Sequence, residues 1–488
     1  MKILSEPSRS LKEYRLLTRF TAKDNVVTNV SLKTKLCKYP HKKGHIELNV
    51  PFISAAMQAV SGAKLAEALA QYGGISVLPC SIPIAEQADL VRQVKRFKAG
   101  FQDRVATLAP NDKIEKAVKL MKEKGYSKFP VTQNGEMNGK LLGLLSDKYF
   151  DPKKHAKELV KDYMTRDILI SREGLTLKQA NEMMIKNGKD ILFILDKDDK
   201  LKLVSFKKDM TKHLDFPDEL IDERKRYMVG AAVSTHPRDR ARVDALLEAE
   251  VDVLFIDSSD GFTEFQTEMY GYIRSKTKTV PVVGGNIITE EGFEYLAKAG
   301  FDAVKIGMGI GSGCTTQEQK GTGRGQATAI AEAVKARDAY FKKTGVYIPV
   351  ISDGSISNPG QIVIALALGA DSVMMGRFFA QFTESASALR NHPTLGPLKE
   401  YWMEASGRAR NYGRYETTSD LFFEEGIEGF VPHIGSIYTQ LQPTINKLKS
   451  ALSNAGCKNI EELHQNAVLE LQSVASLQDA GVHDIIMK

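Results

Sequence analysis

The sequence is poor in cysteine and has no long apolar stretch. Its four cysteines, Cys37, Cys80, Cys314 and Cys457, lie far apart and form no C-x-x-C pair, so neither a disulfide framework nor a cysteine-rich zinc site is expected. No H-E-x-x-H occurs, which excludes that metal-hydrolase motif. No apolar run reaches the roughly 18 residues of a membrane helix, and the first residues lack the apolar core of a signal peptide. We therefore expect a cytoplasmic protein.

The charged residues are evenly mixed along the chain. There are 67 lysines and arginines against 60 aspartates and glutamates, a formal net charge of +7 over 488 residues. Because the basic residues are interleaved with acidic ones, we interpret them as a solvated surface and expect neither nucleic acid nor a membrane as a partner. With 42% hydrophobic and 26% charged residues, the composition is typical of a globular protein too long for one small domain.

Eight short apolar runs alternate with helical patterns. None of the runs shows strict polar–apolar alternation, which is typical of parallel strands buried on both faces. Eight strand–helix units predict an α/β fold, specifically a (β/α)8 TIM barrel. The predicted strands span 50–57, 73–79, 227–233, 251–257, 279–286, 302–308, 349–355 and 371–377, and predicted helices include 61–73, 240–250, 290–300 and 327–345.

The stretch between the second and third predicted strands contains an internal repeat. One copy begins at Asp112 and the other at Leu175, and each reads as a helix followed by two strands. Two such copies can bury each other's apolar faces, which one copy cannot do alone. We therefore predict an inserted domain at 104–212, within a barrel formed by 1–103 and 213–488.

Residues that can bind an anion follow the last two predicted strands. Gly354 and the Gly376–Arg377 pair occupy the usual phosphate position of a TIM barrel. Glycine lets backbone N–H groups approach the anion, and an arginine adds a charged fork. Ser312 could donate a hydroxyl. The alternative interpretation is that these glycines only form tight turns.

Two carboxylates end predicted strands at the same edge of the barrel. Asp353 could accept hydrogen bonds from a ribose beside the phosphate, and Asp257 could do so for a second sugar. A carboxylate at a strand end is rarely a core residue, because a buried unpaired charge is costly. The segment 390–488 is longer than a last barrel helix needs, and we expect it to supply loops over the barrel mouth.

Cys314 follows a glycine-rich loop after the sixth predicted strand. A thiol on such a loop can be exposed, and nearby N–H dipoles favour its thiolate, which suits a covalent nucleophile. Filling of space by a small apolar side chain is the alternative. The loop matches neither the G-x-G-x-x-G fingerprint nor a P-loop. It could let the nucleophile move, or it could present backbone carbonyls to a monovalent cation.

Two further segments have less specific patterns. A basic and aromatic stretch reads either as a surface loop or as a mobile lid; it contains Arg408, Arg410, Tyr412, Arg414 and Tyr415. Glu424 and Glu425 alone would be interpreted as solvated charges.

Several motifs together resemble the inosine-5′-monophosphate (IMP) dehydrogenase family over nearly the whole chain. They include SAAMQAVSG at 54–62, IDSSDG at 256–261, GIGSGCTTQEQKGTGRGQ at 309–326, MMGRFFA at 374–380 and FEEG at 423–426. The predicted insert resembles a tandem pair of CBS modules. The resemblance implies a homotetramer and the binding of purine nucleotides at the insert.

The resemblance also implies a reaction and its catalytic residues. IMP would be oxidised with NAD to xanthosine 5′-monophosphate (XMP), a step of guanine nucleotide biosynthesis. Cys314 matches the nucleophile that adds to C2 of the purine and forms an adduct that is then hydrolysed. Arg414, with Tyr415, matches the residue that activates water. Thr316 and Glu425 match a second proton route.

The binding residues are implied in the same way. Those that match substrate contacts are Met57 for the base, Asp353 for the ribose, and Ser312, Gly354, Gly376, Arg377 and Tyr401 for the phosphate. Those on the NAD side are Asp257, Ser258, Ser259, Asn286 and Gly307. Backbone carbonyls of Gly309, Gly311 and Cys314 match a potassium site.

The chain departs from the family pattern at four positions. Gly313 stands where isoleucine or valine is usual, Ser355 replaces the second glycine of Asp-Gly-Gly, and Met403 and Ala405 occupy positions that are usually glycine-rich. One alternative function is GMP reductase, which shares the cysteine and the threonine–glutamate pair but lacks the arginine–tyrosine pair. Another is a catalytically weakened purine-nucleotide sensor. The preference between NAD and NADP stays open.

Overall fold

The computed structural model describes residues 1, 3–39, 46–97, 101–102, 105–124, 127–175, 177–207, 216–409 and 424–480. The chain divides into two compact units. The barrel unit comprises Met1–Lys95, Asp218–Leu220 and Met228–Lys488, and the inserted unit comprises Arg96–Pro217 and Ile221–Tyr227.

The barrel unit is built on a closed barrel of eight parallel strands. Each predicted apolar run overlaps one of them, and only β13 extends beyond its run, by one residue, so the predicted TIM barrel is confirmed. Every residue of these strands is buried except Asp353, which is partly exposed. In barrel order the strands are β4 (Phe52–Ser54), β5 (Ile75–Leu78), β11 (Gly230–Val233), β12 (Val253–Ile256), β13 (Val282–Ile287), β14 (Ala303–Ile306), β15 (Val350–Asp353) and β16 (Ser372–Met375), which pairs with β4.

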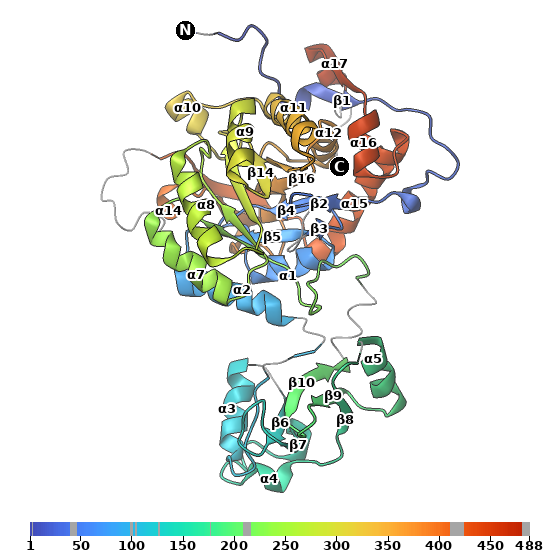
Figure 1. Ribbon diagram of the computed structural model, residues 1–488, viewed down its shortest axis with the longest axis vertical. Helices are drawn as coiled ribbons and strands as arrows, with labels where there is room; N and C mark the ends of the chain where they lie inside the picture. The colour runs from blue at the N-terminus through green and yellow to red at the C-terminus, as the bar shows by residue number, and fades with distance from the viewer. Residues whose placement is uncertain are drawn as a thin grey trace. The chain divides into compact units, whose positions relative to one another are not determined.

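Helices pack on the outside of the strands, as Figure 1 shows for α7, α8, α9 and α11. The sequence sets their ends: Thr289 accepts a hydrogen bond from Gly292 N at the start of α9, and Gly300, with φ of 102°, ends it. The longer helices are α1 (Ala63–Gln71), α2 (Ile84–Phe97), α7 (Arg240–Glu248), α8 (Glu264–Lys276), α9 (Glu290–Ala299), α11 (Gln326–Thr344), α12 (Pro359–Ala367) and α15 (Ile437–Asn454). The shorter ones are α10 (Thr316–Lys320), α13 (Arg377–Ala380), α14 (Gly407–Ala409), α16 (Ile460–Asn466) and α17 (Val474–Asp479).

The segments before β4 and after β16 add small antiparallel sheets to the barrel unit. One sheet contains β17 (Leu389–His392), β18 (Gly396–Trp402) and β19 (Glu428–Pro432). Another pairs β1 (Tyr14–Leu16) with β20 (Leu469–Leu471), and β2 (Thr34–Lys35) pairs with β3 (Glu47–Leu48). The turn after β18 and the residues before β19 reach the cavity at the carboxyl ends of the barrel strands.

Three aspartates stand at the opposite, amino-terminal edge of the barrel. Asp252, Asp302 and Asp371 directly precede β12, β14 and β16. Each accepts a hydrogen bond from a backbone N–H at the start of the neighbouring strand and pairs with a buried or half-buried cation. The N–H donors are Val229 (2.9 Å), Val282 (2.8 Å) and Val350 (2.8 Å), and the cations are Lys95, Arg274 and Arg337 respectively. These contacts tie adjacent strands together.

The inserted unit contains two copies of a helix followed by an antiparallel strand pair. The first consists of α3 (Ile114–Lys124), β6 (Lys128–Thr132) and β7 (Leu141–Ser146), and the second of α5 (Leu177–Lys186), β9 (Ile191–Leu195) and β10 (Leu201–Phe206). The short elements α4 (Val160–Tyr163) and β8 (Leu169–Arg172) lie between them in the chain. Ala117 of the first helix and Ala180 of the second are fully buried at corresponding positions.

None of the helices within the described ranges is both long and apolar enough to span a membrane. All four cysteines are unpaired. Cys37, Cys80 and Cys457 are buried, and burial raises the pKa of the Cys37 and Cys457 thiols. Cys314 alone is partly exposed, which distinguishes it as the thiol open to a reaction partner.

Candidate active site

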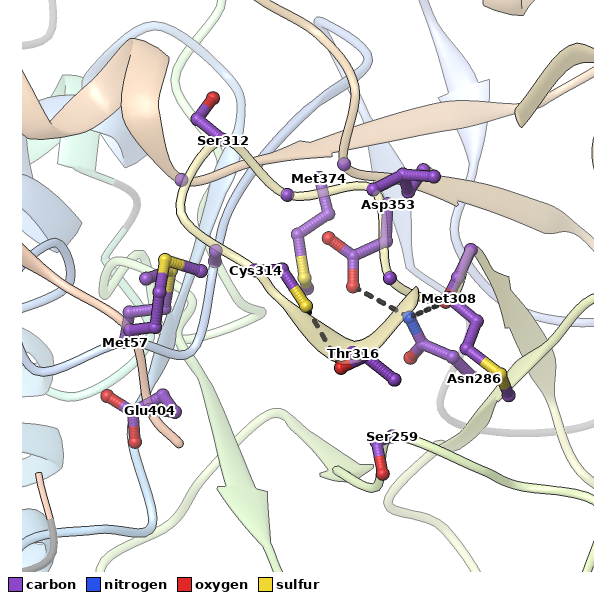
Figure 2. Close-up of a pocket in the computed structure, with 18 of the residues that line it drawn as sticks. Met57, Ser259, Asn286, Met308, Ser312, Cys314, Thr316, Asp353, Met374 and Glu404 are labelled. Carbon is purple, nitrogen blue, oxygen red and sulfur yellow. Dashed lines mark hydrogen bonds between the residues drawn. The ribbon is translucent and has the colours of Figure 1, made fainter. Parts of the chain in front are cut away.

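A cavity of about 240 Å³ lies at the carboxyl ends of the barrel strands. Figure 2 shows part of its lining, which comes from the ends of several strands and from the C-terminal segment. This is the edge at which TIM barrels place their active sites. The residues predicted to bind or react here line this cavity, Ser258, Ser259 and Ser312 included, together with the potassium candidates Gly309 and Gly311. The exceptions are Arg414 and Tyr415, which lie outside the described residues.

Cys314 lies in the loop between β14 and α10, with its thiol beside the first residue of that helix (Figure 2). Its Sγ is 3.1 Å from the Thr316 hydroxyl oxygen, and that oxygen lies 2.8 Å from Glu425 Oε2. Because a carboxylate only accepts, the threonine hydroxyl donates to Glu425 and keeps lone pairs that can accept from the thiol. The three residues form a path along which a proton can leave the sulfur.

Backbone hydrogen bonds bring Glu425 to this position from more than a hundred residues away. Thr315 N donates to Glu425 O at 3.0 Å, and Ile427 N donates to Gly313 O at 3.0 Å. Cys314 and Gly426 are thereby paired as an isolated antiparallel bridge. The segment before β19 acts as a short strand added to the nucleophile's loop.

Lys320 is a second side-chain partner of the Glu425 carboxylate. Its Nζ lies 3.1 Å from Glu425 Oε1, the oxygen not used by Thr316. Lys320 and Thr316 are four residues apart on α10, so one helix turn directs both toward the same carboxylate. This lysine gives no signal in the sequence, because it lies in a polar helix without apolar periodicity.

Lys305 is the second residue of the site that was not among the predicted site residues. It lies in β14 with a side chain only 4% exposed, and its Nζ donates to Asp257 Oδ1 at 3.0 Å and to Asp353 Oδ2 at 2.8 Å. Burial disfavours the charge of Lys305, but the two carboxylates outweigh burial and raise the pKa of the ammonium. A lone lysine inside an apolar predicted strand is the signal that could have identified it.

Asn286 joins the same cluster. Its Nδ2 donates to Gly307 O at 2.7 Å and to Asp353 Oδ2 at 3.1 Å, and Figure 2 shows both bonds. The residues predicted for the ribose of the substrate and for the cofactor side are therefore linked directly through Asp353. Two ligands bound on either side of this cluster would contact neighbouring groups of one hydrogen-bonded network.

The predicted phosphate side has little room for side chains. A Cβ at Gly376 would lie 2.9 Å from Met57 Sδ and 3.0 Å from the Tyr401 hydroxyl. Only glycine therefore fits at this position without moving Met57 or Tyr401. Gly354 has φ of +93°, and Ser355 has φ of +59°, an unusual conformation for a serine. Tyr401 is buried, and burial together with Asp353 raises the pKa of its phenol.

The candidate cation site consists of backbone oxygens only. Within the described ranges, no group of three or more His, Cys, Asp or Glu side chains is arranged to hold a metal ion. The Gly311 carbonyl already accepts a hydrogen bond from Cys314 N at 3.0 Å and retains a second lone pair.

Comparison with known proteins assigns the chain to a family. The family model described as the IMP dehydrogenase / GMP reductase domain matches residues 13–483. The chain is 41% identical to an inosine-5′-monophosphate dehydrogenase of Tritrichomonas foetus, covering 100% of this chain and 98% of that protein. It is 34% identical to the enzyme of the same name from Schizosaccharomyces pombe, covering 94% and 88%.

A solved structure shows the same architecture. A cysteine-to-alanine variant of GMP reductase from Trypanosoma brucei, in complex with guanosine 5′-monophosphate, superposes with a TM-score of 0.89 at 25% identity and covers 99% of both chains. The family match spans the barrel, the insert and the C-terminal segment that carries Glu425. The chain therefore belongs to the IMP dehydrogenase / GMP reductase family.

Proposed function

We propose that this protein is an IMP dehydrogenase that oxidises IMP to XMP with NAD, through an adduct on Cys314, in guanine nucleotide biosynthesis. The observation that carries the proposal is the path from Cys314 Sγ through Thr316 to Glu425, inside a cavity that also contains the Asp257–Lys305–Asp353 cluster. The cavity then contains a nucleophile, a proton acceptor and two carboxylates that can bind sugars.

The substrate would be oriented by three parts of the cavity. The phosphate would be held by backbone N–H groups of Gly354 and Gly376 and by the guanidinium of Arg377. Asp353 would accept hydrogen bonds from the ribose, and the base would lie against Met57 with C2 toward Cys314. Binding in this pose makes addition of the thiol effectively unimolecular.

In the first step, Cys314 Sγ bonds to C2 of the purine while the thiol proton passes by way of Thr316 to Glu425. When bound, NAD would supply the acceptor for the hydride that leaves C2. The carbon is thereby oxidised and remains bonded to sulfur. In the second step, water attacks C2, the C–S bond breaks, XMP leaves, and the thiol is regenerated with net release of one proton. Splitting the reaction in two avoids one difficult combined step.

The water must lose a proton in the second step. Among the described residues, Thr316 and Glu425 are placed to take it, because they already adjoin Sγ. We assign a parallel role to Arg414 and Tyr415 from the family pattern. An arginine side chain normally keeps its proton throughout the physiological pH range, so this role would require a dry and tuned environment.

The residues present fit a dinucleotide on the Asp257 side. Asp257, Ser258, Ser259 and Asn286 line the same cavity as Cys314. Asp257 would accept from a ribose hydroxyl, as carboxylates do in other dinucleotide sites. The carbonyls of the Cys314 loop also suit a weakly hydrated cation, and we propose potassium there. Replacing potassium with lithium at constant ionic strength should then lower turnover.

The direct test is to mix the protein with IMP and NAD and to follow NADH by absorbance and XMP by chromatography. Mass spectrometry of the peptide containing Cys314 should reveal a trapped purine adduct. IMP binding without any turnover would instead support the nucleotide-sensor alternative.

GMP reductase is the second candidate, favoured by one observation: the similarity of the whole chain to the Trypanosoma brucei structure. The Thr316–Glu425 pair suits that reaction equally well. Oxidation of NADPH in the presence of GMP, with no XMP formed from IMP and NAD, would reverse the assignment.

We further propose that the inserted unit is a pair of CBS modules that binds purine nucleotides, and that the protein is a cytoplasmic homotetramer. The repeated helix and strand pair supports the first point. Calorimetry of the full chain with ATP or GTP should show heat even when excess IMP fills the barrel site, and absence of heat would contradict it. Sedimentation measures the assembly.

A further inference from the structure

Three glycines beside the nucleophile leave a space that one methionine fills. A Cβ at Gly313 would lie 2.9 Å from Met403 Sδ and 3.1 Å from Met403 Cγ. A Cβ at Gly311 would lie 3.4 Å from Met403 Cε, and one at Gly426 would lie 2.3 Å from Met403 Cβ. The Met403 side chain therefore lies directly on the backbone of the loop that carries Cys314.

The backbone explains how Met403 reaches this loop. Met403 N donates to Ile427 O at 3.2 Å, and Ile427 N donates to Gly313 O at 3.0 Å. The segment around Gly426 is thus hydrogen-bonded to Met403 on one side and to the Cys314 loop on the other. Because Gly426 is buried and has no side chain, the thioether can cross over it to reach Gly313, which is also buried.

We propose that Met403 is a positioning residue for the nucleophile. Its side chain packs on Gly311 and Gly313 and holds the backbone of the Cys314 loop in place, so that Cys314 Sγ stays in contact with Thr316. The inference rests on the proposed function for its kinetic consequences, but the contacts themselves do not depend on it. Displacement of a reacting atom by about 1 Å can cost about 100-fold in rate.

The same contacts unite two departures from the family pattern. A side chain at position 313 and the methionine at position 403 would compete for one volume, since a Cβ at 313 would meet Met403 Cγ and Sδ. Glycine at 313 with methionine at 403 is one solution, and a branched residue at 313 with glycine at 403 is its reciprocal. The two positions are therefore expected to be energetically coupled.

The test is a double-mutant cycle on the full chain with Met403→Gly, Gly313→Ile and both together. We expect each single variant to lower kcat about 10-fold or more, through a void in one case and overpacking in the other. The double variant should recover to within about threefold of the parent. If Gly313→Ile does not fold, Gly313→Ala replaces it, because a single Cβ at 313 would meet mainly the flexible Met403 side chain and would lie 3.3 Å from Ile427 Cγ1.

A second readout does not require turnover. Cys314 is the one partly exposed thiol, so its alkylation by iodoacetamide reports its position directly. The alkylation rate should change in Met403→Gly and return in the double variant, even if IMP is not the substrate. Failure of IMP turnover in the parent would thus reject the proposed function without deciding the role of Met403.

Two controls separate positioning from simple packing. Met403→Leu conserves volume and should keep kcat within about threefold. Met308→Ala removes another methionine of the cavity, and Gly313→Ile should not rescue it. Equal melting temperatures with a shifted kcat would support the proposal. It would be overturned by additive effects in the cycle, or by a Met403→Gly variant with unchanged kcat and alkylation rate.

Discussion

The two ends of the barrel differ in how their aspartate carboxylates are paired with cations. At the amino-terminal edge, the side chains of Asp252, Asp302 and Asp371 are 10%, 2% and 6% exposed, and a different cation pairs with each. At the carboxyl edge, those of Asp257 and Asp353 are 18% and 20% exposed and share the single ammonium of Lys305.

This difference separates stability from function. At the amino edge each carboxylate also accepts from a backbone N–H of the neighbouring strand, so its contacts hold strands together. At the carboxyl edge Asp257 and Asp353 line the cavity, where a ligand can donate further hydrogen bonds to their carboxylates. Substitutions at the first edge should change the free energy of unfolding, and substitutions at the second should change turnover.

The largest effect is expected for Cys314→Ala, at the carboxyl edge. Turnover of IMP should fall by about 10⁴-fold or more, because no other described group can form the adduct. The melting temperature should stay within about 2 °C of the parent, since Cys314 is only partly buried. Steady-state kinetics, calorimetry with IMP and a thermal scan check these outcomes. Residual turnover above about 1% would contradict the covalent route.

Arg337→Met should have the largest effect at the amino edge. It leaves the buried Asp371 without its arginine, and the free energy of unfolding should fall by about 3 kcal/mol. The kcat of the folded enzyme should be unchanged. Denaturant unfolding followed by tryptophan fluorescence measures the loss. Lys335→Met, on the same helix but exposed, is the control and should have little effect.

Lys305→Met should lower kcat/KM for both IMP and NAD by about 10- to 100-fold. The folded-state pKa of Lys305 is raised, so the cation it supplies is present throughout the neutral range and is lost only in strong alkali. Without it, Asp257 and Asp353 lose their shared cation and repel each other at neutral pH. Lys305→Arg keeps the charge and should retain more of kcat/KM than Lys305→Met. Steady-state kinetics with each substrate measure both variants.

The smallest expected effect is that of Ser355→Gly, which tests strain at the carboxyl edge. Ser355 has φ of +59°, so glycine should raise the free energy of unfolding by about 0.5–1 kcal/mol. Ser357→Gly is the matched control. Ser357 is not left-handed and its hydroxyl donates to Gln361, so this change should destabilise the protein. Chemical denaturation of both variants distinguishes them.

The sequence predicted the barrel because its strands are buried on both faces and give continuous apolar runs. It also predicted the glycines and carboxylates at the strand ends, since a TIM barrel places them at one edge. Cys314 and Asp353 were identified in this way. The family motifs added Thr316 and Glu425, whose contact links parts of the chain with no local pattern in common.

Other parts of the site could not be predicted from the sequence. Lys305 was read as one residue of a core strand, because its two carboxylate partners come from different strands of the closed barrel. In the sequence, Gly313 and Met403 are separate departures from the family pattern, and their contact depends on a three-stranded arrangement of distant segments. Lys320 gives no signal until Glu425 is placed beside its helix.

The seam between β4 and β16 has a consequence for biosynthesis. Met374 pairs with Ile53, so β4, which the ribosome makes early, cannot form this pairing until β16 has been synthesised. Until then the nascent chain has an open sheet edge, which invites wrong pairing. Cys314 is also synthesised before Glu425. The nascent chain therefore contains the nucleophilic thiol before it contains the carboxylate that accepts its proton.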